Sequence, residues 1–200
     1  MSRPADPLAR SKLLRAAREE FAQAGLNEAR VEDIARRAGL AKGSFYLHFK
    51  SKEEVFKALL DHFLVECGRF AEACQPELAQ VQSVGDVRRF FCRQDAEMLE
   101  FLWSQRDILQ VFYQAGSTPQ YQHVLNAFLD AQAATTAAQL RELQDRGLYR
   151  AELDAEVVST CIVGAYHNLT RHLAASRAKP DLAGHAETIV SLFLEGLSVR

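Results

Sequence analysis

Apolar side chains recur at helical spacing along most of the chain, and the first stripe runs through Leu13, Leu14, Ala17, Phe21 and Ala24. Residues three and four apart share one face of a helix, so the stripe predicts an amphipathic helix. No run alternates apolar and polar residues between hairpin turns, as a half-buried strand would. The pattern therefore predicts an all-α fold, with helices at 7–24, 31–38, 42–48, 51–74, 84–103, 106–115, 118–146, 154–176 and 181–198.

Polar residues that favour the first position of a helix stand at several of these predicted starts. Ser51 opens one helix, and Glu54 completes a capping-box pattern in which each side chain satisfies the other's end of the chain. Four further caps are expected at Ser83, Ser117, Asp154 and Asp181.

Glycine and proline mark the predicted helix ends. Ala-Gly-Leu occurs at Gly25 and Gly39, and a related Arg-Gly-Leu occurs at Gly147. Glycine adopts the left-handed conformation that closes a helix, and the following leucine can fold back onto the last turn. Pro76 lacks a backbone N–H, so the helix from Ser51 is expected to end at about residue 74.

Two short helices at 31–38 and 42–48, joined by a glycine turn, predict a helix-turn-helix. In this motif the second helix lies in the DNA major groove. Phe45 and Phe49 share one face of that helix, with Ile34 as an expected neighbour, so this face is expected to be buried. Its other faces carry groups that suit a groove and its phosphates: Lys42, Gly43, Ser44, Tyr46, Leu47 and His48.

Charge is distributed unevenly along the chain. Residues 1–52 carry 11 Lys and Arg against 6 Asp and Glu, whereas residues 53–200 carry 13 against 20. A basic head on an acidic body indicates that the head meets a polyanion. Lys50 and Lys52 flank the start of the helix at 51–74, whose positive end can hold a phosphate.

Four motifs follow one another in this head: Ala22-x-x-Gly25, Val31-x-Asp33-Ile34-Ala35-x-x-Ala38-Gly39, Lys42-Gly43-x-Phe45-Tyr46-x-His48-Phe49 and Lys50-x-Lys52-Glu53-x-x-Phe56. In this order they resemble the N-terminal domain of TetR/AcrR-family transcriptional regulators. The resemblance runs from about Leu8 to Phe63. It implies an N-terminal three-helix helix-turn-helix domain at 1–52, with the helix from Ser51 as its link to a C-terminal helical ligand-binding and dimerisation domain at 53–200.

The resemblance also implies a homodimer whose third helices enter the major groove of a palindromic double-stranded DNA operator. The family's usual dimer interface would lie in the helices at about 154–176 and 181–198. By analogy, Lys42, Tyr46 and Lys52 match positions that commonly contact phosphate. Ser44, Leu47 and His48 match positions that face the groove.

Three positions depart from the family's pattern. Ala29-Arg30 and Ala41 stand where a serine or threonine usually precedes the second and third helices, so each loses a cap worth about 1 kcal/mol. Arg30 is expected to supply the lost phosphate contact. Leu47 stands where polar or aromatic residues are common, and it either meets a thymine methyl group or packs against the domain.

Aromatic residues are concentrated between 84 and 128, and polar groups interrupt the apolar helix around Tyr166. Small-molecule sites are mostly apolar with a few placed polar groups, whereas any one of these residues is also explained by core packing. The candidate pocket residues are Phe91, Phe101, Trp103, Phe112, Tyr121, Tyr166, His167 and Asn168.

Catalytic and metal-binding patterns are not found in the sequence. There is no nucleophile elbow, zinc-protease motif, dinucleotide fingerprint or phosphate loop, and the four cysteines form no C-x-x-C pair. We therefore expect no enzyme activity, no cofactor and no metal. Without a long apolar run or a signal-like start, the expected location is the cytoplasm.

The leading hypothesis is a DNA-binding transcriptional regulator, a repressor that responds to a small apolar or aromatic effector. The alternative is a helical small-molecule-binding or catalytic protein whose basic head is only structural. A third possibility is a DNA-binding dimer without any effector.

Overall fold

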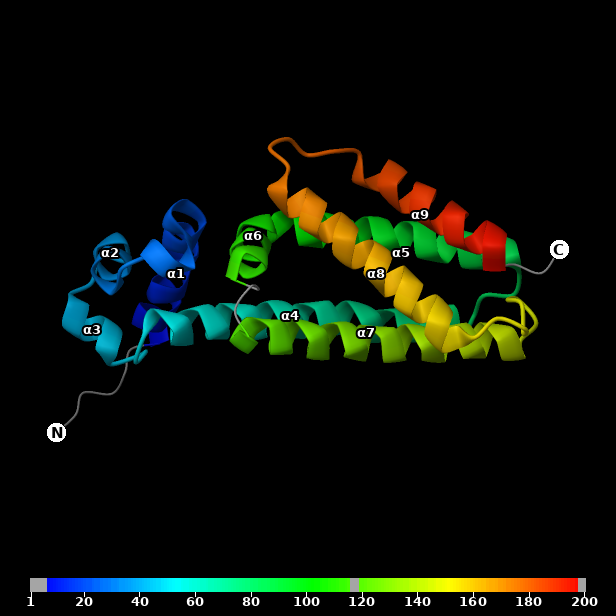
Figure 1. Ribbon diagram of the computed structural model, residues 1–200, viewed down its shortest axis with the longest axis horizontal. Helices are drawn as coiled ribbons and strands as arrows, with labels where there is room; N and C mark the ends of the chain where they lie inside the picture. Colours follow the sequence, from blue (N-terminus) through cyan, green and yellow to red (C-terminus); the bar gives the residue numbers. More distant parts are fainter. Residues whose placement is uncertain (1–6, 116–118, 198–200) are drawn as a thin grey trace. The chain divides into compact units, whose positions relative to one another are not determined.

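The computed structural model describes residues 7–115 and 119–197, and within them the regular secondary structure is entirely helical. This confirms the predicted all-α fold. The helices in chain order (Figure 1) are α1 (Pro7–Glu28), α2 (Val31–Arg37), α3 (Lys42–Tyr46), α4 (Lys52–Leu78), α5 (Val84–Ser104), α6 (Arg106–Ala115), α7 (Pro119–Asp145), α8 (Ala155–Ala175) and α9 (Leu182–Leu197). None of the helices in these described ranges is long and apolar enough to cross a membrane.

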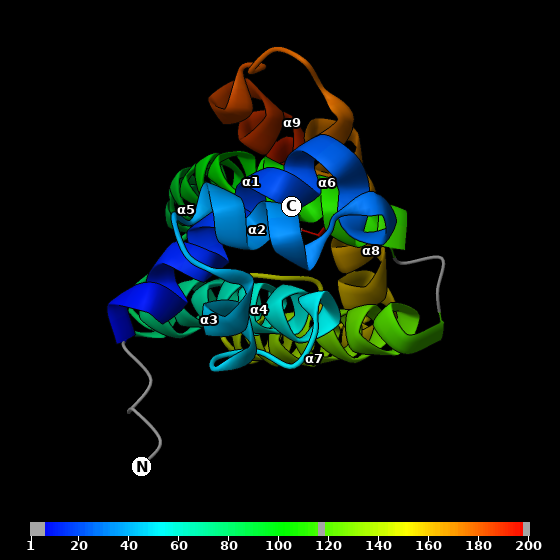
Figure 2. The ribbon, with the colours of Figure 1, turned by 90° about the vertical axis from the view of Figure 1, so that its left-hand side faces the viewer.

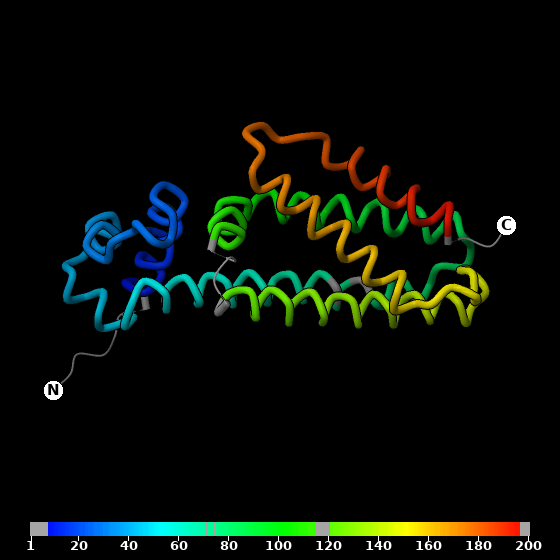
Figure 3. The backbone as a smooth tube through the Cα atoms, viewed as in Figure 1, coloured from blue at the N-terminus to red at the C-terminus, as the bar shows by residue number. Residues whose placement is uncertain are grey.

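The chain divides into two compact units. The head unit runs to Glu66 and also takes in Asp107–Tyr121, whereas the body unit comprises Cys67–Arg106 and the chain from Gln122 onward. Figure 2 shows α1, α2 and α3 of the head unit, and Figure 3 follows the backbone through both units. The boundary between 52 and 53 stays a prediction about functional domains, because compactness alone divides the chain elsewhere.

Aromatic contacts hold the head unit together. Phe21 of α1 meets Phe56 of α4 edge to face, with ring centroids 5.9 Å apart, and Tyr121 of α7 meets Phe56 in the same way at 5.1 Å. All three side chains are buried. Arg18 of α1 adds a two-armed ion pair with Asp107, whose two bonds are both 2.6 Å long. These contacts explain why α6 and the start of α7 belong to the head unit.

The body unit is built on α5 and α9, which pack against each other. The inner stripe of α9 is Leu182, Ala186, Val190 and Leu194, and all four are buried. Their spacing of four residues keeps them on one face of the helix. The body core is divided into two apolar clusters, one containing Val190 and Leu194 and the other Leu182 and Ala186.

Three of the predicted caps form. The side-chain oxygens of Ser83, Asp154 and Asp181 accept hydrogen bonds from backbone N–H groups in the first turns of α5, α8 and α9. Such bonds satisfy donors that have no partner inside the helix. Ser117 lies outside the described residues.

The capping box at the start of α4 forms in a shifted version. Ser51 Oγ accepts a hydrogen bond from the Glu54 N–H at 3.3 Å, as expected. The Glu54 carboxylate accepts from the Lys50 N–H at 2.6 Å, and not from the serine. The two side chains therefore still order the chain that leads into α4.

All three predicted glycine stops interrupt or end a helix. Gly39 and Gly147 have φ values of 68° and 69°, and the residue after each donates its N–H back to the last helical turn. Gly25 also has a positive φ of 76°, but the chain turns once more after it and α1 continues to Glu28. The helical run therefore breaks at Gly25 as predicted, because the backbone of this residue is not helical (ψ 165°), and the residues up to Glu28 form a separate short turn within α1.

Proline does not end α4, so the predicted end at residue 74 was wrong. The helix passes through Pro76 and ends at Leu78, which is fully buried. A proline in the last turn removes only one backbone hydrogen bond. The Arg146 guanidinium compensates near this end by donating to the carbonyl oxygens of Leu78, at 3.0 Å, and Val81.

Candidate nucleic-acid interface

The helix-turn-helix is present in α2 and α3, but its second helix is shorter than predicted. α3 spans only Lys42–Tyr46, and Leu47 is its C-terminal cap. The expectation of a helix to residue 48 was wrong, although the Phe49 N–H still bonds to the Phe45 carbonyl at 3.0 Å. This last bond extends the turn and keeps both phenylalanines on one side.

The two predicted anchors of α3 are buried. Phe45 is fully buried and Phe49 is 3% exposed, and their ring centroids lie 5.9 Å apart. Ile34 of α2 is fully buried as well. The short helix is therefore held by packing, which replaces the side-chain cap that Ala41 cannot provide. α2 likewise starts at Arg30 without a side-chain cap, as expected from the sequence.

The opposite side of α3 faces solvent. Tyr46 is 51% exposed and Leu47 is 61% exposed, while Ser44 and His48 are half-buried. Leu47 therefore does not pack against the domain, which leaves the thymine contact as the expectation for it. A Cβ at Gly43 would meet nothing within 4 Å, so packing within the protein does not require a glycine there.

Lys42 carries an ion pair that the sequence analysis did not predict. Its Nζ lies 2.5 Å from Oε1 of Glu32 in the first turn of α2. The hydrogen bond between them raises the pKa of Lys42 and lowers the pKa of Glu32. Both groups are therefore charged at neutral pH, and the recognition lysine has an anionic partner before any DNA is bound.

Lys52 has a structural role in addition to the predicted phosphate contact. Its Nζ donates to the carbonyl oxygens of Asn27, at 2.5 Å, and Ala29, at 3.0 Å. It thus ties the end of α1 to the start of α4. Arg30 and Lys50 are exposed, and neither side chain forms a salt bridge with another residue in the described ranges.

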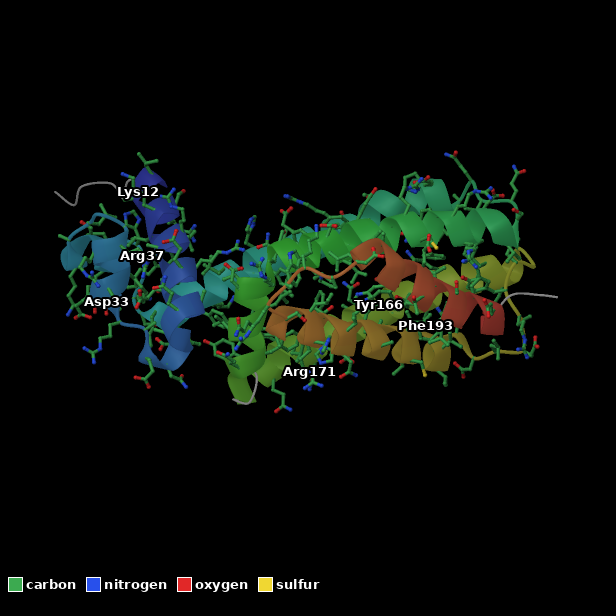
Figure 4. All side chains as sticks on the ribbon, turned by 90° about the horizontal axis from the view of Figure 1, so that it is seen from above. Lys12, Asp33, Arg37, Tyr166, Arg171 and Phe193 are labelled. Atoms are coloured by element: carbon green, nitrogen blue, oxygen red, sulfur yellow. The ribbon has the colours of Figure 1, made fainter. Side chains whose placement is uncertain are left out.

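The basic residues of α1 were not among the predicted DNA-binding residues. Arg10 lies with its guanidinium carbon 5.1 Å from the centroid of the Phe49 ring, so it is a cation beside α3. Lys12 (Figure 4) and Arg15 are exposed on the same helix. All three lie outside the apolar stripe of α1, so the sequence already indicated that these basic side chains are on the exposed face of the helix.

Comparison with known proteins agrees with this geometry. The model of a family described as bacterial regulatory proteins, tetR family, matches residues 13–59, from α1 into α4. The uncharacterized HTH-type transcriptional regulator YdgC of Bacillus subtilis is 29% identical over 189 residues, which cover 94% of this chain and 92% of the relative. These matches support a TetR-family transcriptional regulator.

Other transcriptional regulators match along almost the whole chain. The HTH-type transcriptional regulator TtgR of Pseudomonas putida is 27% identical over 192 residues, which cover 94% of this chain and 90% of TtgR. The fold matches SmeT of Stenotrophomonas maltophilia, solved as a complex with triclosan, at 20% identity and a TM-score of 0.75, covering 96% of this chain and 92% of SmeT. The chain is a DNA-binding transcriptional regulator, and its head is not merely structural. The relatives are regulators and not enzymes, while the absence of catalysis in this chain stays a prediction.

The predicted pocket residues are divided between the two units of the chain. Phe112 and Tyr121 are buried in the head unit, so core packing accounts for both. In the body unit, Phe101 contacts Phe70 with ring centroids 5.0 Å apart, and the Arg106 guanidinium lies 4.7 Å from the Trp103 ring. A common pocket for all eight stays a prediction.

The remaining candidates all lie in the body unit. Phe91 meets Phe90 edge to face at 5.0 Å, Asn168 is exposed, and burial lowers the pKa of His167. Tyr166 of α8 is mostly buried and donates a hydrogen bond to a carboxylate of α5.

That carboxylate belongs to Asp95, a partly buried acid that was not among the predicted site residues. Burial raises its pKa to about 6, although the hydrogen bond from Tyr166 acts in the opposite direction. Burial raises the pKa values of Tyr149 and Cys92, and the negative charge of the nearby Asp95 carboxylate raises both further. An aspartate in an amphipathic helix gives no sign of burial in the sequence, so only the packing of α5 against α8 reveals it.

Proposed function

We propose that this TetR-family regulator acts as a repressor in the cytoplasm, binds a palindromic operator as a homodimer through α3, and is released by a small-molecule effector held in the body unit. The observation that carries the DNA-binding part is the two-sidedness of α3. Its phenylalanines are buried, while Lys42, Gly43, Tyr46 and Leu47 face solvent. The exposed residues of such a helix do not contribute to the core of the head, so they are available to contact the major groove.

Phosphate contacts are assigned to the basic groups around α3. Arg30 precedes α2, Lys42 opens α3, and Lys50 precedes α4. Tyr46 adds a hydroxyl on the exposed face, and Lys52 would have to share its ammonium with the carbonyl oxygens that it already holds. Ser44, Leu47 and His48 are assigned to base edges, where sequence is read.

Binding to duplex DNA is tested by its salt dependence. A labelled 30-base-pair duplex from the DNA flanking the protein's own gene, titrated in fluorescence anisotropy, should bind with a log affinity that falls linearly with log salt. The slope should be about −0.9 for each phosphate neutralised. A scrambled duplex should bind more weakly with a similar slope. No binding to either duplex at low salt would contradict the proposal.

The homodimer is assigned to the outer faces of α8 and α9. Val157 of α8 is 61% exposed and Leu192 of α9 is 71% exposed, although both are large apolar side chains. Cys161 is exposed on α8, and a Cβ at Gly164 would meet nothing within 4 Å. Apolar side chains and a small residue on exposed helix faces suit a second copy of the same chain, whose helices can approach closely there.

Introducing a charge at this surface should separate the subunits. Leu192→Glu should reduce the mass measured by light scattering from about twice 22.4 kDa to 22.4 kDa, because the interface would bury an unpaired carboxylate. Val65→Glu is the matched control, because Val65 is 53% exposed on α4, outside the proposed interface. A Leu192→Glu protein that stays dimeric, or a Val65→Glu protein that also dissociates, would contradict this assignment.

The effector is assigned to the body unit by its aromatic residues and by the polar groups of α8. The SmeT complex with triclosan supports a small aromatic ligand as the class to test first. Addition of such a compound should lower the affinity for the operator, because an effector shifts the equilibrium only if it prefers the conformation that does not bind DNA. DNA binding that no compound changes would favour a dimer without an effector.

A further inference from the structure

The ion pair between Glu32 and Lys42 lies on the surface that is proposed to face DNA. Glu32 is in the first turn of α2, Lys42 is the first residue of α3, and their charged atoms are 2.5 Å apart. The side chains are 56% and 53% exposed. A phosphate approaching α3 can therefore reach the lysine and the carboxylate alike.

Local electrostatics explain why this pair forms. A lysine at the first residue of a helix sits at the positive end of the backbone dipole, where a cation is unfavourable. Ala41 offers no side chain to cap that end. Glu32 supplies the missing negative charge, and it is itself well placed because the first turn of α2 favours an acid. The carboxylate thus occupies the place beside Lys42 that a DNA phosphate would take.

Among the described residues, the other acids of the head unit do not pair with Lys42. Asp33 pairs with Arg36 at 2.7 Å within α2, and Glu20 pairs with Arg37 at 3.0 Å between α1 and α2. Figure 4 labels Asp33 and Arg37 on α2. Four cations are assigned to phosphate: Arg30, Lys42, Lys50 and Lys52. Within the described part of the chain, Lys42 is the one of these that pairs with a carboxylate.

We propose that Glu32 competes with the DNA backbone for Lys42 and so lowers the affinity of the head for DNA of any sequence. The inference rests on the proposed contact between Lys42 and phosphate. When DNA binds, the ammonium exchanges a carboxylate for a phosphate, and Glu32 is left beside a polyanion. Because phosphate contacts carry no sequence information, the effect applies equally to operator and non-operator DNA. The competition therefore increases the rate at which the regulator dissociates from non-operator DNA.

The size of the effect is modest and depends on salt. Exposed ion pairs of this kind change an equilibrium by up to about fivefold. Screening weakens both the pair and the repulsion between Glu32 and phosphate as ionic strength rises. Removing the carboxylate should therefore tighten DNA binding most at low salt.

The test is a double-mutant cycle on the full chain, with a random-sequence 30-base-pair duplex as the probe. Glu32→Gln should bind this duplex about two- to fivefold more tightly than the parent protein at about 50 mM salt, and the gain should disappear at about 300 mM. In a Lys42→Met background, Glu32→Gln should change the affinity less than 1.5-fold. Glu28→Gln, a loss of the same charge at the end of α1, is the control and should change it less than 1.5-fold.

Each outcome separates the inference from the proposed function. If Lys42→Met weakens binding but Glu32→Gln equals the parent, Lys42 contacts DNA and the competition is refuted. If Glu32→Gln tightens binding equally with and without Lys42, Glu32 acts by general repulsion and the inference is overturned. If the parent protein does not bind the duplex, the proposed function itself fails. Thermal unfolding of each variant within about 3 °C of the parent establishes that the head is intact.

Discussion

Replacing Phe45 by alanine should lower the free energy of unfolding of the head unit by about 3–5 kcal/mol and abolish DNA binding. Phe45 is fully buried, and its ring contacts both Tyr46, at 5.5 Å, and Phe49, at 5.9 Å between centroids. The substitution leaves a cavity beneath a five-residue helix that has no side-chain cap. Such a helix has no other source of stability comparable to this anchor.

Urea unfolding followed by circular dichroism measures the free energy of unfolding of the Phe45→Ala protein. Fluorescence anisotropy with the labelled duplex measures its DNA binding. Leu47→Ala is the control, because Leu47 is two residues away but 61% exposed, so the stability should change by less than about 0.5 kcal/mol. The subunit mass should remain that of a dimer in both variants. A Phe45→Ala protein as stable as Leu47→Ala would show that α3 does not depend on this anchor.

Asp95 should make the stability of the body unit fall as the pH rises. Its pKa in the folded protein is about 6, above the usual 3.8, so the folded state holds the proton more tightly than the unfolded state. The contribution of the protonated acid is therefore fully present below pH 4 and is lost as the pH rises through 6. The raised pKa corresponds to a loss of about 2–3 kcal/mol between pH 4 and pH 7.

Asp95→Asn should remove this dependence. The amide oxygen can still accept the Tyr166 hydrogen bond, but no charge has to be buried when the pH rises. The difference in unfolding free energy between variant and parent should therefore shift in favour of the variant by about 2–3 kcal/mol from pH 4 to pH 7. Urea titrations at several pH values measure it.

The control for this prediction is Glu97→Gln, because Glu97 lies on the same helix but is exposed. Its stability should follow the parent protein at every pH. Parallel stability curves for Asp95→Asn and the parent would show that Asp95 is ionised as easily in the folded as in the unfolded state.

Local signals in the sequence were reliable where the structure depends on neighbouring residues. The caps at Ser83, Asp154 and Asp181 and the glycine stops at Gly39 and Gly147 involve partners within a few positions, and all five formed. The burial of Phe45 and Phe49 followed in the same way from helical spacing.

Predictions failed where a distant residue changed the balance. Pro76 reads as a helix stop, but Arg146, seventy positions later, holds the carbonyl of Leu78 and the helix continues. For Lys52 the phosphate contact stays a prediction, but its bonds to carbonyl oxygens at the end of α1 were not predicted. Neither partner is visible in the local sequence, because the contact exists only after the helices have packed.

By itself, the sequence determined the all-α class, the helix-turn-helix and the two-sided character of α3, since these depend on spacing and on the conformations open to glycine and proline. Only the tertiary structure decided which charges are paired. It placed Glu32 against Lys42, Arg18 against Asp107 of α6, and Tyr166 against a partly buried Asp95. The physical reason is that burial and the distance between charges, which set both pKa and pairing, are properties of packed helices and not of any segment of the chain.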